Sequence, residues 1–138
     1  MYTVIGRFAP QTFAIMRIII GLLFALHGVQ ILFGFPPMEG MGGQLPPIVM
    51  AAGVIEFVGG LMVAMGLLTG IAAFISSGTM AVAYFTVHAP NGWHPITNKG
   101  ELAAVYCFIF LYIAAHGAGV WSIDSAIRGR SATAATTS

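Results

Sequence analysis

Four long apolar runs dominate the chain, separated by short polar, proline-rich or glycine-rich connections. They cover about residues 13–35, 48–68, 71–89 and 102–120. Each run holds about 19 to 23 residues, enough at roughly 1.5 Å per residue to cross about 30 Å of hydrocarbon. The runs are continuous and do not alternate between apolar and polar positions, which argues against membrane-spanning strands. The pattern predicts four transmembrane helices.

The connections between these runs differ in length and character. The second and third runs are joined almost directly at 69–70, so we expect these two helices to be antiparallel neighbours. The loops at 34–47 and 90–100 are longer and carry most of the proline residues. Residues 131–138 have the composition of a disordered tail.

Composition makes the chain an integral membrane protein. Hydrophobic residues make up 58% of it and charged residues only 7%, against roughly 25% charged in an ordinary soluble domain. The length indicates a single domain, residues 1–138. One cysteine, Cys107, excludes an internal disulfide. A net charge of +1 without a basic run gives no reason to expect nucleic acid as a partner. The expected fold class is therefore all-α, a four-helix transmembrane bundle.

The positions of Lys and Arg predict the orientation. Four helices put both termini on one side, which carries Arg7, Arg17, Arg128 and Arg130, whereas the other side carries only Lys99. By the positive-inside rule, both termini face the cytoplasm and the two longer loops face outward.

Ionisable residues inside the apolar runs are the candidate functional residues, because such groups are costly in lipid and usually face the bundle interior. With the predicted orientation, His27, Glu56, His88 and Glu101 fall in the outer half of one bundle. Glu56 lies about nine residues, roughly 13 Å, below the outer surface. Arg17 falls in the inner half, where we expect its guanidinium to extend to the headgroups.

Helical spacing predicts which side chains share a face. Glu56 lies in a stripe of small residues, which lets another helix approach closely and predicts that Glu56 is buried in protein. Tyr84 and His88 share a face of the third helix. Glu101 shares a face of the fourth helix with Phe108 and Tyr112. We expect each of the four helices to have one face that carries polar residues, and these four faces to converge inside the bundle. The small residues around Glu56 are Ala52, Gly53, Gly59 and Gly60.

In this order and spacing the residues resemble the DoxX family of small bacterial membrane proteins. The resemblance rests on RIIIGLLFALHG at 17–28, EFVGGL at 56–61 with GLLT at 66–69, NKGE at 98–101 and GAGVWSID at 117–124. Two positions depart from the family pattern: Gln30 stands where a Lys is frequent, and Ala118 stands where the last motif has Pro. The resemblance implies a four-helix protein of the bacterial inner membrane. It links the chain to quinone-coupled oxidation of sulfur compounds and to redox defence complexes.

Three functions remain open from the sequence. The first is a redox-linked membrane subunit with a quinone-type or proton-handling site, in which His27, Glu56 and Glu101 exchange protons and hydrogen bonds. A quinone is the cofactor that fits it, and its electrons would come from a partner, because no CxxC, haem or flavin motif occurs. The second is a non-catalytic accessory subunit of a larger complex or a homo-oligomer. The third is a membrane protein that binds a metal or small solute. In the first of these functions, the residues expected to line the quinone head group are Gln30, Tyr84, His88 and Tyr112.

Overall fold

The computed structural model describes residues 2–37 and 43–136, with side chains from Val4 to Gly129 apart from the 38–42 segment. The predicted all-α fold class is confirmed, and no strand occurs among the described residues. Three helical spans are long and apolar enough to cross a membrane: Gly6–Phe33, Pro47–Met65 and Thr69–Asn91. A fourth apolar helix, Glu101–His116, is shorter.

Proline and glycine residues mark two of the helix ends. The N-terminal segment is α1 (Tyr2–Ile5) and η1 (Gly6–Phe8), which lead into α2 (Ala9–Phe33) with a proline in its first turn. Next come α3 (Pro47–Met65) and α4 (Thr69–Ala83). The chain continues from α4 through a π-helical turn, η2 (Tyr84–His88), and a 3-10 turn, η3 (Ala89–Asn91). The end of α3 is a left-handed Gly66, a residue type that adopts this conformation without a Cβ penalty.

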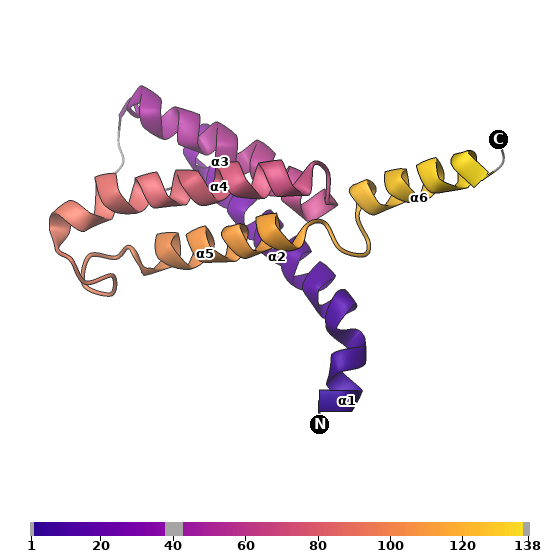
Figure 1. Cartoon of the computed structure of the whole chain (residues 1–138). Coiled ribbons are helices and arrows are strands. Elements are labelled where there is room, and N and C mark those ends of the chain that lie inside the picture. The colour runs from indigo at the N-terminus through magenta and orange to yellow at the C-terminus, as the bar shows by residue number, and fades with distance from the viewer. Residues whose placement is uncertain (1, 38–42, 137–138) are drawn as a thin grey trace.

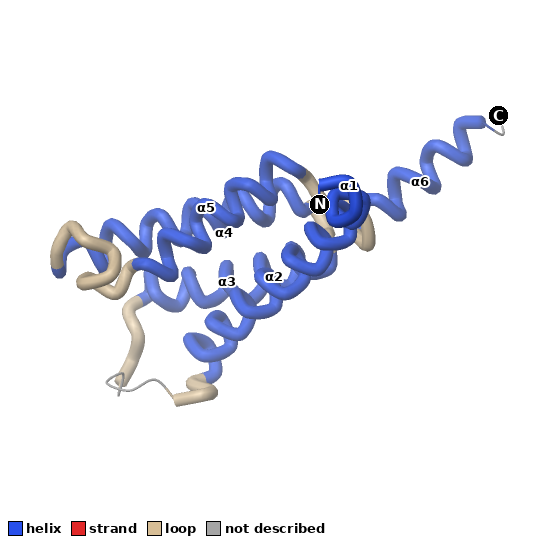
Figure 2. The backbone as a smooth tube through the Cα atoms, turned by 90° about the horizontal axis from the view of Figure 1, so that it is seen from below, coloured by secondary structure: helices blue, strands red, loops and turns tan. Residues whose placement is uncertain are grey.

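The bundle has two distinct ends. Figure 1 shows α4 and α5 (Glu101–His116) side by side, with α2 crossing them obliquely. We call the end with the N-terminus and the α3–α4 turn the terminal end. The opposite end, with residues 34–37, 43–46 and 92–100, is the loop end. In Figure 2, α2 and α3 lie together on one side of the α4–α5 pair. The predicted antiparallel α3–α4 pair is present, joined through residues 66–68. Which end faces the cytoplasm stays a prediction.

Helix α2 packs on α3 at backbone distance. A Cβ on Gly28 would overlap the backbone nitrogen of Phe57, and a Cβ on Gly21 would lie 2.6 Å from the backbone nitrogen of Ala64. Such contacts replace the missing hydrophobic driving force inside lipid by close van der Waals packing. On α3, Gly53 and Gly60 are buried against α2 and Gly59 against α4, so the predicted role of the small-residue stripe in helix contact is confirmed for these three glycines.

The chain after α5 differs from the sequence expectation. The fourth helix ends at His116, earlier than the predicted residue 120, because Gly117 and Gly119 leave the helical conformation at positive φ. In place of a disordered tail from residue 131, α6 (Ile123–Thr136) continues as a helix to Thr136. Residues 137–138 lie outside the described range. Figure 1 shows α6 running away from the bundle.

Arg17 is wholly buried, so the expectation that it extends to the headgroups is wrong. Its Nη1 donates to the carbonyl oxygens of Val63, at 2.5 Å, and Ala64, at 2.7 Å, at the end of α3. Its Nη2 donates to the carbonyl oxygen of Trp121 at 2.8 Å. The last carbonyls of a helix have no partner within the helix, and a cation is favourable there. Arg17 thus ties α2, α3 and the segment after α5 together.

Asp124 holds the start of α6 against the α3–α4 turn. Its carboxylate accepts hydrogen bonds from the backbone N–H groups of Leu68 and Thr69, both at 2.9 Å, and from the Thr69 hydroxyl at 2.8 Å. Burial acts to raise the pKa of Asp124, but these hydrogen bonds and the charge of Arg128 outweigh it and lower that pKa below its usual value. A side chain distant in sequence thus caps α4.

Candidate functional site

Glu56 lies on the face of α3 that points into the bundle. On one side of it, Gly53 and Gly60 pack against α2, and on the other side Gly59 packs against Ser76 of α4. A side chain between two such contacts points between the two neighbouring helices. The carboxyl-bearing side chain is only 6% exposed, as the sequence predicts. It makes no hydrogen bond or ion pair with any residue in the described part of the chain.

Tyr106 of α5 completes this interior from the opposite side. It is 4% exposed, and its ring stacks on Phe110 and lies against Phe24 of α2. Its ring also meets that of His27, and Gly28, next to His27, packs on Phe57, next to Glu56, so Tyr106 and Glu56 lie at the same level of the bundle. Tyr106 is not among the site residues predicted from the sequence. The buried face of α5 consists of four residues at helical spacing: Ala103, Tyr106, Phe110 and Ile113. This spacing is hard to recognise in the sequence because the helix is apolar on every side.

His27 reaches the same place from α2. Its ring meets the ring of Tyr106 edge to face, with centroids 5.9 Å apart. The His27 side chain is exposed, whereas Phe24, one turn earlier, is buried. His27 therefore lies at the border between the interior and the surroundings. We call Glu56, Tyr106 and His27 the interior polar group.

Glu101 does not join the interior polar group. It lies exposed in the first turn of α5 and makes no hydrogen bond or ion pair with a described residue. The face that it begins continues through Phe108 and Tyr112, which are 70% and 57% exposed. The predicted convergence of this face on the bundle interior is wrong. The reason is that α5 buries aromatic and small side chains, and its carboxylate stands at the helix start, where it can reach water.

Tyr112 belongs to the terminal end. Its ring meets the ring of Phe13 edge-on, at 6.0 Å between centroids, and Phe13 stacks on His116 at 3.8 Å. Phe13 lies near the start of α2, four helical turns or so before the level of Glu56 and His27. The structure therefore does not bring Tyr112 to the predicted head-group site.

Tyr84 and His88 organise the loop end. His88 Nδ1 lies 3.1 Å from the carbonyl oxygen of Asn98, and the Asn98 amide donates to the Tyr84 hydroxyl at 3.4 Å and to the carbonyl oxygen of Gly92 at 2.8 Å. Asn98 is buried, so this network fixes the segment between η3 and α5. Gln30 makes a different contact: its amide donates to the carbonyl oxygen of Pro36 at 3.1 Å. These contacts give Tyr84, His88 and Gln30 structural partners.

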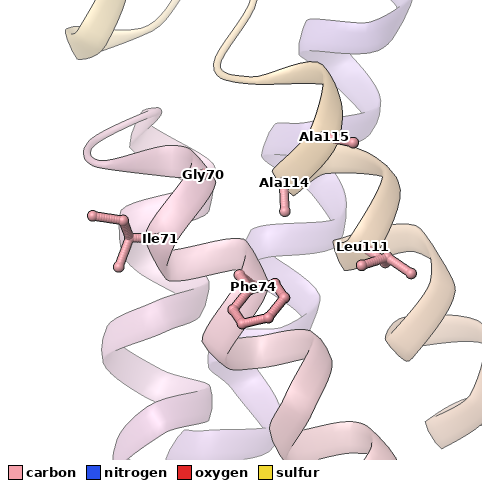
Figure 3. A pocket seen from close by; sticks show the side chains of 6 residues that line it. All are labelled: Gly70, Ile71, Phe74, Leu111, Ala114 and Ala115. Carbon is pink, nitrogen blue, oxygen red and sulfur yellow. The ribbon is translucent and has the colours of Figure 1, made fainter.

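A groove lies away from the interior polar group. It has a volume of about 440 Å³ and lies between α4 and α5 near the terminal end (Figure 3). Ile71 and Phe74 stand at it with their side chains exposed, and its walls offer almost no polar surface. In a membrane this groove faces the lipid. It contains no group able to exchange a proton. Its lining residues are Gly70, Ile71, Phe74, Leu111, Ala114 and Ala115.

Metal binding is the third function predicted from the sequence. Among the described residues, no three His, Cys, Asp or Glu side chains form a group that could hold a metal ion. The metal-binding alternative therefore has no geometric support in that part of the chain.

Long apolar helices, packed through glycine around a buried carboxylate, define a helical integral membrane protein. Comparison with known proteins supplies the family. The DoxX family model matches residues 12–89, and the chain belongs to the DoxX family. The resemblance drawn from the sequence is thereby confirmed.

One curated relative supports the assignment. A protein of Haemophilus influenzae, described as an uncharacterized protein, is 41% identical over 124 residues. The match covers 86% of this chain and 92% of the relative. No solved structure matches the chain.

Proposed function

We propose that this DoxX-family protein is a redox-linked membrane protein whose interior polar group binds a quinone-type head group and exchanges protons with it. The observation that carries the proposal is the Glu56 carboxyl, buried in the bundle with no ionic partner among the described residues, at the level of Tyr106 and His27. An ionisable group without a partner is costly in a membrane, and such groups usually have a function there.

The three side chains offer the chemistry that a quinone needs. Reduction of a quinone to a quinol takes two electrons and two protons, one proton for each oxygen. Glu56 exchanges a proton from the interior, and His27 hydrogen-bonds a carbonyl oxygen from the border where an apolar ligand enters from lipid. Tyr106 provides an aromatic wall and a hydroxyl. The electrons come from a partner protein or a soluble reductant.

The setting of this chemistry belongs to the same proposal. With both termini in the cytoplasm, the interior polar group lies in the outer half of the inner membrane of a bacterium, and the loop end faces outward. The protein crosses the membrane several times and works with a protein partner of a redox complex or as a homo-oligomer.

The test is ligand-induced stabilisation of the purified protein. A short-chain quinone should raise the melting temperature of the wild type in detergent, because a ligand that binds only the folded state stabilises it. Glu56→Gln and Tyr106→Phe should reduce this rise. The matched control is Glu101→Gln, which removes a carboxylate from the outward face of α5 and should leave the rise unchanged.

Three outcomes count against the proposal. Equal responses in Glu56→Gln and the wild type would place quinone binding elsewhere. Stabilisation by divalent cations alone would favour the metal-binding alternative. No response to either ligand would favour the accessory subunit, for which α6, extending beyond the bundle, provides a segment available to a partner (Figure 1).

A further inference from the structure

The hydroxyl of Ser76 is a buried polar group that lacks a hydrogen bond. Ser76 on α4 is 0% exposed, and its Oγ has no hydrogen-bond partner among the described residues. Buried side-chain hydroxyls in folded proteins nearly always have a partner, from the protein or from an ordered water molecule. Ser76 therefore needs a specific explanation.

Neighbouring hydroxyls on the same helical span show the usual solutions. Thr79 donates to the carbonyl oxygen of Ile75 at 3.0 Å, one turn back on its own helix. Ser77 donates across to the carbonyl oxygen of Cys107 at 2.8 Å. The Ser76 hydroxyl does neither and turns to α3, where a Cβ added to Gly59 would lie 2.8 Å from its Oγ. The glycine at position 59 makes room for this hydroxyl.

On α3 the hydroxyl has one available side-chain partner. Glu56 is the only polar side chain between Pro47 and Met65, and it lies one turn from Gly59 with no hydrogen bond of its own. The other interior polar groups are engaged or stand on other helices. Those on α5 are Tyr106 and Cys107, which accepts from Ser77. On α2, His27 lies at the border and Arg17 is bonded to the end of α3. Gln11, whose buried Oε1 also lacks a partner among the described residues, stands in the first turn of α2, about four turns from the level of His27.

The spacing indicates an indirect contact. Glu56 lies about 4.5 Å along the helix axis from the level of Gly59, at three residues of roughly 1.5 Å each. Helical side chains lean toward the N-terminus of their helix, which takes the carboxyl further from that level. A separation of this size between two buried polar groups suits one bridging water molecule.

We propose that the Ser76 hydroxyl is linked to the Glu56 carboxyl through one buried water molecule across the α3–α4 interface. Ser76 is a positioning residue: it holds the carboxyl in place and does not itself touch a ligand. A hydroxyl and a water molecule can each donate or accept, so they satisfy Glu56 in both protonation states. The inference deepens the proposed function, because it names what supports proton exchange at Glu56.

Infrared difference spectroscopy between acid and alkaline pH tests the proposal. The carbonyl stretch of protonated Glu56 is the band that disappears in Glu56→Gln. Ser76→Ala should move this band to higher frequency, because the water molecule that hydrogen-bonds the carboxyl loses its anchor on α4. The matched control Ser77→Ala removes a hydroxyl bonded to Cys107 and should leave the band in place. An unmoved band in Ser76→Ala, or no Glu56-dependent band in the wild type, would overturn the proposal.

A double-mutant cycle provides a second, independent measurement. Changes in melting temperature for Ser76→Ala and Glu56→Leu should be non-additive in the double variant, because leucine cannot bind the water molecule, whereas Ser77→Ala and Glu56→Leu should add. Additivity in the first pair would contradict the proposed contact. Neither measurement uses a quinone. Failure of quinone binding with an intact Ser76–Glu56 coupling would therefore reject the proposed function and leave this inference standing.

Discussion

Gly21 of α2 and Gly60 of α3 face each other so closely that a Cβ on either residue would lie 2.6 Å from the carbonyl oxygen of the other. The relationship is reciprocal, so neither helix can accept a side chain here without moving away from its partner. Because Glu56 lies one turn from Gly60, this contact also fixes how deeply the carboxyl is buried between the helices.

Gly60→Ala is expected to destabilise the bundle although it adds a single methyl group. The new Cβ would meet backbone atoms of Gly21 and Ala25, which cannot rotate away, and overpacking of this kind typically costs about 1–3 kcal/mol. The measurement is the melting temperature of the purified protein in detergent.

The control for this substitution is Gly78→Ala. Gly78 lies in α4, is exposed, and has nothing within 4 Å of the position of its Cβ. This variant should keep the wild-type melting temperature or exceed it slightly, because alanine favours a helix. Equal destabilisation by both substitutions would show that α2 and α3 are not packed at backbone distance.

Much of this interface could be predicted from the sequence, because glycine in an apolar run has few other uses. The spacing of Gly53, Glu56, Gly59 and Gly60 placed small residues and a carboxylate on one helix face, and the structure buries all four. The two-residue turn between the second and third runs likewise predicted antiparallel neighbours. Local patterns were sufficient where one face of a helix differed clearly from the others.

Arg17→Gln should destabilise the terminal end of the bundle. The substitution withdraws hydrogen bonds from the carbonyl oxygens of Val63, Ala64 and Trp121, and a buried polar group left without its partner costs about 1–3 kcal/mol. Melting temperature in detergent is again the measurement. Arg7→Gln is the control, because Arg7 lies exposed beside the ring of Phe8. Equal effects of the two variants would mean that the Arg17 contacts contribute little.

The contribution of Asp124 to stability should depend on pH. The pKa of Asp124 is lower in the folded protein, so its contribution is fully present above the unfolded value of about 3.9 and is lost as pH falls through the folded value. Near neutral pH, Asp124→Ala should cost about 0.5–2 kcal/mol, as expected for a lost helix cap. The wild type and Asp124→Ala should converge in melting temperature only at pH below about 3.9. A difference that vanishes already at neutral pH would contradict this role.

The rest of the site could not be predicted because it depends on contacts between segments far apart in sequence. Arg17 is bonded to residues that follow it by 46 to 104 positions, and nothing in its own helix distinguishes a buried arginine from one that reaches the headgroups. In α5 every face is apolar, so the sequence did not separate the buried Tyr106 from the exposed Phe108 and Tyr112. On this helix the prediction selected Glu101 because it is ionisable, although Glu101 lies at the start of the helix.

The orientation is tested by reporter fusions. Fusions at Gly43 and Asn98 should report the outside, and fusions at Thr69 and Ser131 should report the cytoplasm, because the arginines gather at the terminal end. If a C-terminal fusion reports the outside, the bundle has the opposite orientation and the interior polar group lies in the cytoplasmic half.

Photoaffinity labelling with an azido-quinone, followed by mass spectrometry of the labelled peptides, locates the quinone site directly. Adducts are expected on α2 and α5 around His27 and Tyr106, and their yield should fall with excess unlabelled quinone and in Glu56→Gln. Adducts confined to the groove around Phe74 and Leu111, with equal yield in Glu56→Gln, would contradict the proposed site.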